Sequence, residues 1–331
     1  MAKEQLIDKT NRVINYLRLS ITDRCNLRCT YCMPEEGINF LPHSEILTYE
    51  EMLHLVRLSV EAGIRKVRLT GGEPLVRKGF IPFLESLCRI EALKEITLTT
   101  NGVLLKELAA DIKACGISRI NISLDSLKAE RFFQITGRDY FDRVWEGIQE
   151  AERLEFDPIK INVVVMKGIN DEEILDFARL TLEKPYHIRF IEFMPVGANN
   201  GWSPKKFISM EEIREQIGTL GVLRPVKSNP LDGPAQRYVL ERAKGEIGFI
   251  GALSNHFCEK CNRLRITAEG HLRGCLFSDQ EIDIKSPLRE GKGDAHLFDL
   301  ISDAMKNKPR EPGAGRHGPR KCIRQMSSIG G

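Results

Sequence analysis

Short apolar segments alternate with stretches of helical spacing along residues 16–194 of this chain. We predict six strands, each followed by helical structure, and such alternation is typical of a parallel sheet. The strands are expected at residues 16–21, 66–70, 95–99, 119–124, 159–165 and 187–193. Six units are fewer than a closed eight-stranded barrel needs. The sequence therefore predicts an α/β fold built on an incomplete (β/α)6 TIM-type barrel.

Side chains of opposite character alternate along five of these strands. In the first strand, Leu17 and Leu19 share one face and Arg18 shares the other face with Ser20. The polar faces together carry Arg18, Ser20, Arg68, Thr70, Thr97, Thr99, Asn121, Ser123, Lys160 and Asn162. Because parallel sheets are usually covered on both faces, we expect this face to line a cavity for a polar, anionic ligand. The alternative is a sheet face in contact with solvent, and the sixth strand, with Arg189 and Glu192 out of phase, stays unassigned.

Three predicted helix starts carry the capping-box pattern, in which a polar cap residue is followed three residues later by Glu. The pairs are Thr48 with Glu51, Asn170 with Glu173, and Ser209 with Glu212. The last pair lies after Met194, where the strand and helix alternation ends. Short strands near residues 236–240 and 246–250 follow it, and a hairpin turn is expected at residues 268–270.

These patterns predict three regions. The barrel spans residues 1–194, and a smaller α+β region over residues 195–305 is expected to cover its open side. Residues 306–331 form a basic tail that ends in Gly330 and Gly331. Glycine and proline recur between residues 309 and 319, which excludes a regular helix there. By composition alone this tail is a solvated arm.

Six of the nine cysteines form two triads. The first triad, Cys25, Cys29 and Cys32, follows the first strand directly, and the second consists of Cys258, Cys261 and Cys275. A closed cubane of four irons takes four thiolates, so each triad would leave one iron open for a ligand. A zinc site completed by His43, His256 or His271 is the alternative. We expect Cys88, Cys115 and Cys322 to be ordinary free thiols.

Composition excludes several classes of protein. An odd, low number of cysteines and an N-terminus without an apolar core favour a cytoplasmic protein over a secreted one. A bilayer span needs about 18 apolar residues, and the sequence has no such stretch, so we expect no membrane partner. The net charge of +3 gives no reason to expect nucleic acid as a partner.

The first triad with its interleaved aromatic, Cys-x-x-x-Cys-x-Tyr31-Cys, resembles the signature of the radical S-adenosylmethionine superfamily. The Gly-Gly-Glu-Pro run that starts at Gly71 is similar to that superfamily's loop for the methionine amino group. The resemblance implies that the open iron of a 4Fe-4S cluster chelates S-adenosylmethionine and that one electron then releases a 5'-deoxyadenosyl radical. The implied ligands of S-adenosylmethionine are Tyr31, Gly71, Gly72, Glu73, Ser123 and Met194.

The second triad, with Arg263-x-Arg265 beside it and the terminal glycine pair, resembles the GTP 3',8-cyclase family of molybdenum cofactor biosynthesis. The resemblance implies a second 4Fe-4S cluster whose open iron binds the guanine of GTP. The radical would remove hydrogen from the ribose 3'-carbon, which then adds to guanine carbon 8, giving (8S)-3',8-cyclo-7,8-dihydroguanosine 5'-triphosphate. The implied GTP ligands are Arg18, Arg68, Thr99, Lys160, Arg263 and Arg265, and the implied catalytic residues are Arg18, Arg263, Arg265, Gly330 and Gly331.

The same resemblance implies a low-potential electron donor such as flavodoxin, and a downstream cyclic pyranopterin monophosphate synthase. The sequence leaves the oligomeric state open, with a homodimer as one alternative. Two other functions stay open at this point. One is a different radical S-adenosylmethionine enzyme with an auxiliary cluster that matures a peptide, and the other is a zinc-dependent nucleic-acid binder that uses the basic tail.

Overall fold

One curved sheet holds the strands of this protein together. The computed structural model describes residues 7–33, 37, 39–197, 200–227, 231–310 and 322–330. Within these residues the strand order is β12-β11-β10-β1-β2-β3-β4-β5-β6-β9-β8-β7. The strands are β1 (Tyr16–Ser20), β2 (Lys66–Thr70), β3 (Glu95–Thr100), β4 (Ile120–Ser123), β5 (Ile159–Val165), β6 (His187–Glu192), β7 (Leu223–Pro225), β8 (Gln236–Leu240), β9 (Glu246–Ile250), β10 (Arg263–Ile266), β11 (His271–Arg273) and β12 (Ile282–Asp283).

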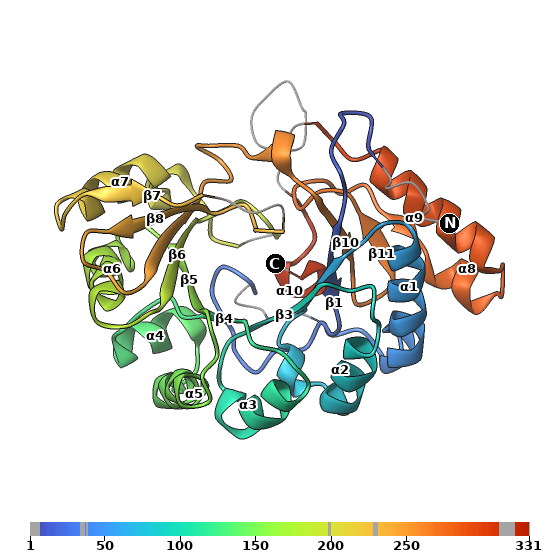
Figure 1. The fold of residues 1–331 in the computed structure, drawn as a ribbon, viewed down its shortest axis with the longest axis horizontal. Helices are drawn as coiled ribbons and strands as arrows, with labels where there is room; N and C mark the ends of the chain where they lie inside the picture. The colour runs from blue at the N-terminus through green and yellow to red at the C-terminus, as the bar shows by residue number, and fades with distance from the viewer. Residues whose placement is uncertain are drawn as a thin grey trace.

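Strands β1 to β6 are parallel neighbours in chain order. The helices between them lie on the outside of the curved sheet (Figure 1). The α-helices between β1 and β6 are α1 (Tyr49–Glu61), α2 (Phe80–Cys88), α3 (Leu105–Ala114), α4 (Ala129–Thr136), α5 (Phe141–Arg153) and α6 (Ile174–Glu183). After β6 follow α7 (Met210–Gly218), α8 (Lys285–Arg289), α9 (Asp294–Lys306) and α10 (Met326–Ile329). The predicted partial (β/α)6 barrel is confirmed, and each of its strands begins and ends within one residue of the predicted range.

The apolar strand faces form the layer between sheet and helices. Leu17, Leu19, Val67 and Leu69 are fully buried, and they belong to one continuous core with the inner face of α1. Helix α1 buries one stripe because its apolar residues recur at helical spacing. The polar strand faces therefore point to the inside of the barrel, as predicted.

The sixth strand follows the same rule with one exception. Ile188 and Phe190 are fully buried in the core, whereas Arg189 and Ile191 line the inner cavity. Glu192 ends the strand, and its carboxylate accepts hydrogen bonds from the amides of Leu253 (2.7 Å) and Ser254 (3.1 Å). The alternation of side chains therefore breaks at Glu192, because this buried carboxylate binds the loop that follows β9.

The C-terminal strands continue the sheet of the barrel. Strand β9 pairs in parallel with β6, and β10 pairs in parallel with β1. The C-terminal region therefore extends the barrel sheet at both of its edges. Residues 251–262 connect β9 to β10 and so run between the two edges across the open side of the barrel. The predicted hairpin between β10 and β11 is confirmed, with Gly270 at φ +83° in its turn.

Two of the three predicted capping boxes are confirmed. At α1 the Thr48 hydroxyl accepts from the Glu51 amide and the Glu51 carboxylate accepts from the Thr48 amide; Ser209 and Glu212 do the same at α7. The prediction for Asn170 and Glu173 is wrong.

The Asn170 side chain instead forms hydrogen bonds with the backbone at the ends of two strands. Its amide group donates to the carbonyls of Asp125 (2.7 Å) and Val164 (2.9 Å), and its oxygen accepts from the Met166 amide (2.7 Å). The Glu173 carboxylate is fully buried and accepts from the Leu127 amide (2.6 Å). Tertiary contacts therefore replace the local cap at this position.

These two uses of a polar side chain predict different losses of stability. We expect Thr48→Ala to lower the free energy of unfolding by about 1 kcal/mol, the usual loss for a cap. Asn170→Ala is expected to lower it by about 3 kcal/mol, because it leaves buried backbone groups without partners. Urea unfolding of the anaerobic holoprotein measures both changes. Ser86→Ala, which removes one exposed hydrogen bond to Pro82, is the control. Equal losses for Thr48 and Asn170 would contradict the account.

In the described part of the chain, none of the helices combines the length and the apolar character that crossing a bilayer requires.

Candidate active site

A cavity of about 280 Å³ lies inside the barrel, and both cysteine triads line it. The topology explains how they share one space. Cys25, Cys29 and Cys32 follow the C-terminal end of β1, whereas Cys261 precedes the N-terminal end of β10. Because β1 and β10 are parallel, the two triads lie toward opposite ends of the barrel, separated by about four residues of strand or roughly 13 Å. Cys275 follows the antiparallel β11 and so lies at the same end as Cys261.

The first triad is held in a tight loop. The amides of Cys32 (2.9 Å) and Met33 (3.0 Å) both donate to the Cys29 carbonyl. The Cys25 sulfur accepts from the Leu27 amide (3.4 Å) and from the Asn101 side chain (3.7 Å). Burial, followed by the nearby Glu73 carboxylate, raises the pKa of the Cys25 thiol to about 11. Without a metal these sulfurs would keep their protons.

The glycine pair after β2 packs directly on the strand that leads to this loop. The Gly72 amide donates to the Thr22 carbonyl (2.7 Å), and the Glu73 amide donates to the Arg24 carbonyl (2.8 Å). A Cβ atom on Gly71 or Gly72 would clash with the backbone of Thr22 or Arg24. The glycines are therefore required by backbone approach, and they fix the position of the cysteine loop.

The six residues predicted to hold S-adenosylmethionine all line the cavity. Glu73 is fully buried, and its carboxylate accepts from the Thr100 hydroxyl (2.7 Å) and the Asn101 amide (2.6 Å). Burial raises the pKa of Glu73 to about 7 although these donors oppose the shift. Its carboxylate thus links the loop after β2 to the end of β3.

Tyr31 reveals a residue that the sequence analysis missed. Its hydroxyl donates to the Asp125 carboxylate (2.6 Å), whose other oxygen accepts from the Val164 amide (2.8 Å). Burial raises the pKa of Asp125 to about 6 against these hydrogen bonds. Asp125 lies just beyond β4, at the C-terminal end where barrel sites are built, and this position was the available signal.

The second triad lies in a basic environment. Both Nε and Nη2 of Arg263 donate to the Cys261 sulfur at 3.4 Å. Burial raises the pKa of Cys261, but Arg263 and Lys308 outweigh it and bring the pKa to about 6. The Lys308 ammonium itself donates to the carbonyls of Arg263 (2.8 Å) and Gly274. Lys308 was missed because it looked like part of a solvated tail.

The donor atoms of both triads suit an iron–sulfur cluster. Each triad offers three thiols that line the cavity, and thiolates are the ligands that a 4Fe-4S cluster takes.

Cationic side chains form rows across the inner face of the sheet. Arg18 is aligned with Arg68 on one side and Arg265 on the other, and Tyr16 is aligned in the same way with Lys66 and Arg263. Neighbouring strands lie about 4.8 Å apart, so like charges are forced close together. Burial and the cations around it lower the pKa of Arg18 to about 10. Such a face is built for a ligand with several negative charges.

The remaining predicted GTP ligands occupy the same face. Arg18, Arg68, Thr99, Arg263 and Arg265 line the cavity, and so does Arg189, whose face the sequence left unassigned. Lys160 is buried on β5 and is not part of the cavity wall. Burial, followed by Arg189 and Arg68, lowers the pKa of Lys160 to about 6.

The C-terminal tail enters this cavity. Helix α10 lies inside the curve of the sheet (Figure 1), and Met326 and Ser327 line the cavity. The Gly330 carbonyl accepts from Arg265 Nη1 (2.7 Å) and Arg18 Nε (3.2 Å). Gly330 has φ +68°, and a Cβ atom there would clash with the Thr70 hydroxyl. Gly331 lies outside the described residues.

Two family models match most of the chain. One, described as the Radical SAM superfamily, matches residues 19–181, and another, described as Molybdenum Cofactor Synthesis C, matches residues 186–313. GTP 3',8-cyclase of Thermodesulfovibrio yellowstonii is 52% identical over 326 residues, covering 98% of this chain and 99% of the relative. GTP 3',8-cyclase of Desulforamulus reducens is 51% identical over 310 residues, covering 92% of this chain and 94% of the relative.

A solved structure supports the fold. The crystal structure of Streptococcus suis SuiB superimposes with a TM-score of 0.62 at 16% identity, covering 92% of this chain and 69% of that chain. At that identity the likeness concerns the fold alone. The two cyclases, by contrast, are 52% and 51% identical to this chain over nearly its whole length. This match in sequence shows that the chain belongs to the GTP 3',8-cyclase family of radical S-adenosylmethionine enzymes.

Proposed function

We propose that this protein converts GTP to (8S)-3',8-cyclo-7,8-dihydroguanosine 5'-triphosphate, the first step of molybdenum cofactor biosynthesis. The observation that carries the proposal is the single cavity with a cysteine triad toward each end and arginine rows between them. A radical S-adenosylmethionine enzyme needs the first triad, and a triphosphate needs the cations. The family to which the chain belongs supports the same reaction.

The first triad would hold one 4Fe-4S cluster, and we extend the proposal to a second cluster on Cys258, Cys261 and Cys275. When bound, the first cluster supplies the electron that cleaves S-adenosylmethionine to a 5'-deoxyadenosyl radical, and the second supplies an open iron for guanine. S-adenosylmethionine would lie against Tyr31, Gly71, Gly72, Glu73, Ser123 and Met194, which share the cavity with the first triad.

The inner face of the sheet would position the nucleotide. Arg18, Arg68 and Arg265 lie side by side in register, and their guanidinium groups are suited to phosphate oxygens. Arg263 donates to the Cys261 sulfur, and the Gly330 carbonyl accepts from Arg18 and Arg265 and so would orient both guanidinium groups. Positioning of this kind supplies most of the rate when a radical must reach one hydrogen among several.

Several finer expectations belong to the same proposal. The division into a barrel (1–194), a C-terminal region (195–305) and a tail (306–331) stays a prediction, as does a cytoplasmic location. A low-potential donor such as flavodoxin would supply electrons, and cyclic pyranopterin monophosphate synthase would consume the product. The homodimer stays a prediction too. SuiB has been solved bound to its precursor peptide SuiA, but at 16% identity its likeness to this chain concerns the fold alone and gives no support to the peptide-maturing alternative. No described contact favours a zinc-dependent nucleic-acid binder.

Anaerobic incubation with GTP, S-adenosylmethionine and dithionite tests the proposed reaction. Mass analysis is expected to find a nucleotide of unchanged mass relative to GTP but shifted retention, formed together with 5'-deoxyadenosine. Enzyme without S-adenosylmethionine is the control. Release of 5'-deoxyadenosine with no change in GTP would contradict the proposal and favour another substrate.

We expect the Lys160 amine to take up a proton when GTP binds. Its pKa of about 6 leaves the amine mostly neutral at pH 7.5 in the free protein. A triphosphate bound at Arg68 and Arg189 would offset the charges that help to lower this pKa and would raise it, so the affinity for GTP is expected to fall as pH rises above about 6, by up to about tenfold per pH unit. Calorimetry in buffers of different ionisation enthalpy measures the uptake. Lys160→Met should abolish the uptake, and Lys113→Met, which changes a half-buried lysine on α3, should not. Uptake that persists in Lys160→Met would disprove this assignment.

A further inference from the structure

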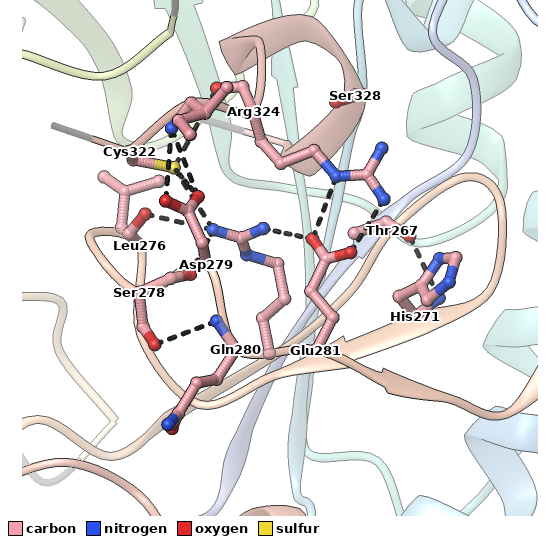
Figure 2. A network of polar contacts seen from close by, with 12 residues as sticks. Thr267, His271, Leu276, Ser278, Asp279, Gln280, Glu281, Cys322, Arg324 and Ser328 are labelled. Atoms are coloured by element: carbon pink, nitrogen blue, oxygen red, sulfur yellow. Dashed lines mark hydrogen bonds and ion pairs between the residues drawn. The ribbon is translucent and has the colours of Figure 1, made fainter.

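The C-terminal tail is tied to the barrel by an ionic network around Arg324, which lies six residues before Gly330. Two nitrogens of the Arg324 guanidinium donate to the Glu281 carboxylate, Nη2 at 2.7 Å and Nε at 3.2 Å. Nη2 also forms an ion pair with Glu269. Figure 2 shows Arg324 reaching from the tail to Glu281, beside His271. Glu281 directly precedes β12 and Glu269 lies in the turn between β10 and β11.

A second set of contacts holds the chain just before Arg324. The Asp279 carboxylate accepts from the Ile323 amide (3.1 Å) and from the Cys322 thiol (3.3 Å). Arg273 is fully buried; its guanidinium pairs with Glu281 and donates to the Cys322 sulfur (3.2 Å). Glu281 therefore contacts both Arg324 of the tail and Arg273 of β11.

The opposite side of the tail packs on the loop after β6. The Gly197 amide donates to the Cys322 carbonyl (2.8 Å), and Val196 forms a parallel bridge with Cys322. Val196, Cys322 and Ile329 share a small apolar core with Ala252 and Phe277. Cys322 is fully buried as a result. The tail is thus clamped between the two edges of the sheet before it turns into the cavity.

From this arrangement we infer that Glu269 and Glu281 form a latch for Arg324, and that the latch positions Gly330 against Arg18 and Arg265. Helix α10 spans most of the distance between latch and glycine, so a fixed Arg324 limits where the Gly330 carbonyl can go. Arg324, Glu269 and Glu281 are positioning residues, since none of them lines the cavity. The effect on catalysis rests on the proposed function, whereas docking of the tail does not.

The same acids could be read as a cation site, because oxygen and nitrogen atoms of Glu269, His271 and Glu281 lie within 4.8 Å of one another. Two guanidinium groups already neutralise the two carboxylates, however. A divalent cation would have to displace Arg324 or the buried Arg273. The protein's own arginine is therefore the ligand of this cluster.

Docking of the tail can be measured through Cys322, independently of catalysis. Cys322 is buried only while the tail is docked, whereas Cys88 and Cys115 are half-buried on the outer helices. A pulse of N-ethylmaleimide on the anaerobic holoprotein, followed by digestion and mass analysis, gives the labelling rate of each thiol. Arg324→Gln and Glu269→Gln are the test variants, and Glu269→Gln leaves the contacts of Arg273 in place. Glu150→Gln, which frees Arg153 on the surface of α5, is the matched control.

We expect Cys322 to be labelled about tenfold faster in both test variants, as loss of a charge-assisted hydrogen bond predicts, with Cys88 unchanged. The yield of cyclised nucleotide per 5'-deoxyadenosine is expected to fall by about the same factor, and Arg324→Lys should restore part of both. Wild-type labelling in the test variants would overturn the latch. Faster labelling with an unchanged yield would overturn its positioning role. If the wild-type protein forms no cyclised nucleotide, the proposed function fails, and the labelling rates alone decide the latch.

Discussion

Replacing Cys275 with serine is expected to reduce the iron content from about eight to about four atoms per chain and to reduce GTP cyclisation to background. Cys275 lines the cavity with Cys258 and Cys261, toward the end of the barrel opposite the first triad. A serine oxygen is a poor ligand for such a cluster, and two thiolates cannot hold it. The first triad is untouched, so cleavage of S-adenosylmethionine to 5'-deoxyadenosine should continue.

Iron and sulfide analysis, electron paramagnetic resonance and the two product assays check this prediction together. Cys115→Ser is the matched control, because Cys115 is a half-buried thiol at the end of α3 far from either triad in the fold. Cys32→Ser should instead lose both 5'-deoxyadenosine and cyclised product, because it removes a thiolate from the first triad. A Cys275→Ser protein that retains all its iron would show that the second triad does not bind a cluster.

Deleting Gly330 and Gly331 is expected to lower cyclisation by at least about 100-fold while 5'-deoxyadenosine is still released. The Gly330 carbonyl is the acceptor between two buried guanidinium groups, those of Arg18 and Arg265. Burial, with Arg18 and Arg263 close by, holds the pKa of Arg265 well below its usual range. Without the carbonyl these two arginines lose the acceptor they share, and the nucleotide loses part of its fixed orientation. The first triad and its loop are not contacted by Gly330.

A single substitution sharpens the test. Gly330→Ala puts a methyl group against Thr70 at a positive φ, and it should reproduce most of the loss. Gly291→Ala is the matched control, since Gly291 also has a positive φ (+67°) but no atom within 4 Å of the added carbon. Full product yield from the deletion enzyme would refute the role of the tail.

The local patterns of the sequence predicted the barrel because each depends on neighbouring residues only. Alternation in residues 66–70 fixes which side chains of β2 face the helices, whatever strand lies beside it. The same parity correctly placed Arg18, Arg68 and Thr99 on the inner face. The capping-box pattern failed at Asn170 because two buried strand ends compete for that side chain, and a local rule does not include them.

Sequence patterns did not identify the residues whose roles depend on partners far away in the sequence. Asp125 matters because Tyr31, 94 positions away, donates to it. Lys308 looked like one more charge in a basic tail, yet it is buried beside Cys261. Arg324 also looked like one more charge in the tail. Its role depends on Glu269 and Glu281, which a hairpin and a short edge strand bring together.

By itself the sequence determined the two cysteine triads, the polar strand face and the glycine pair at the end, because spacing and side-chain parity are properties of adjacent residues. Only the tertiary structure decided that β10 pairs with β1 and β9 with β6, so that both triads and the tail share one cavity. The physical reason is that every strand edge offers the same backbone donors and acceptors. Which edges meet is decided by packing across the whole chain, and no local pattern encodes it.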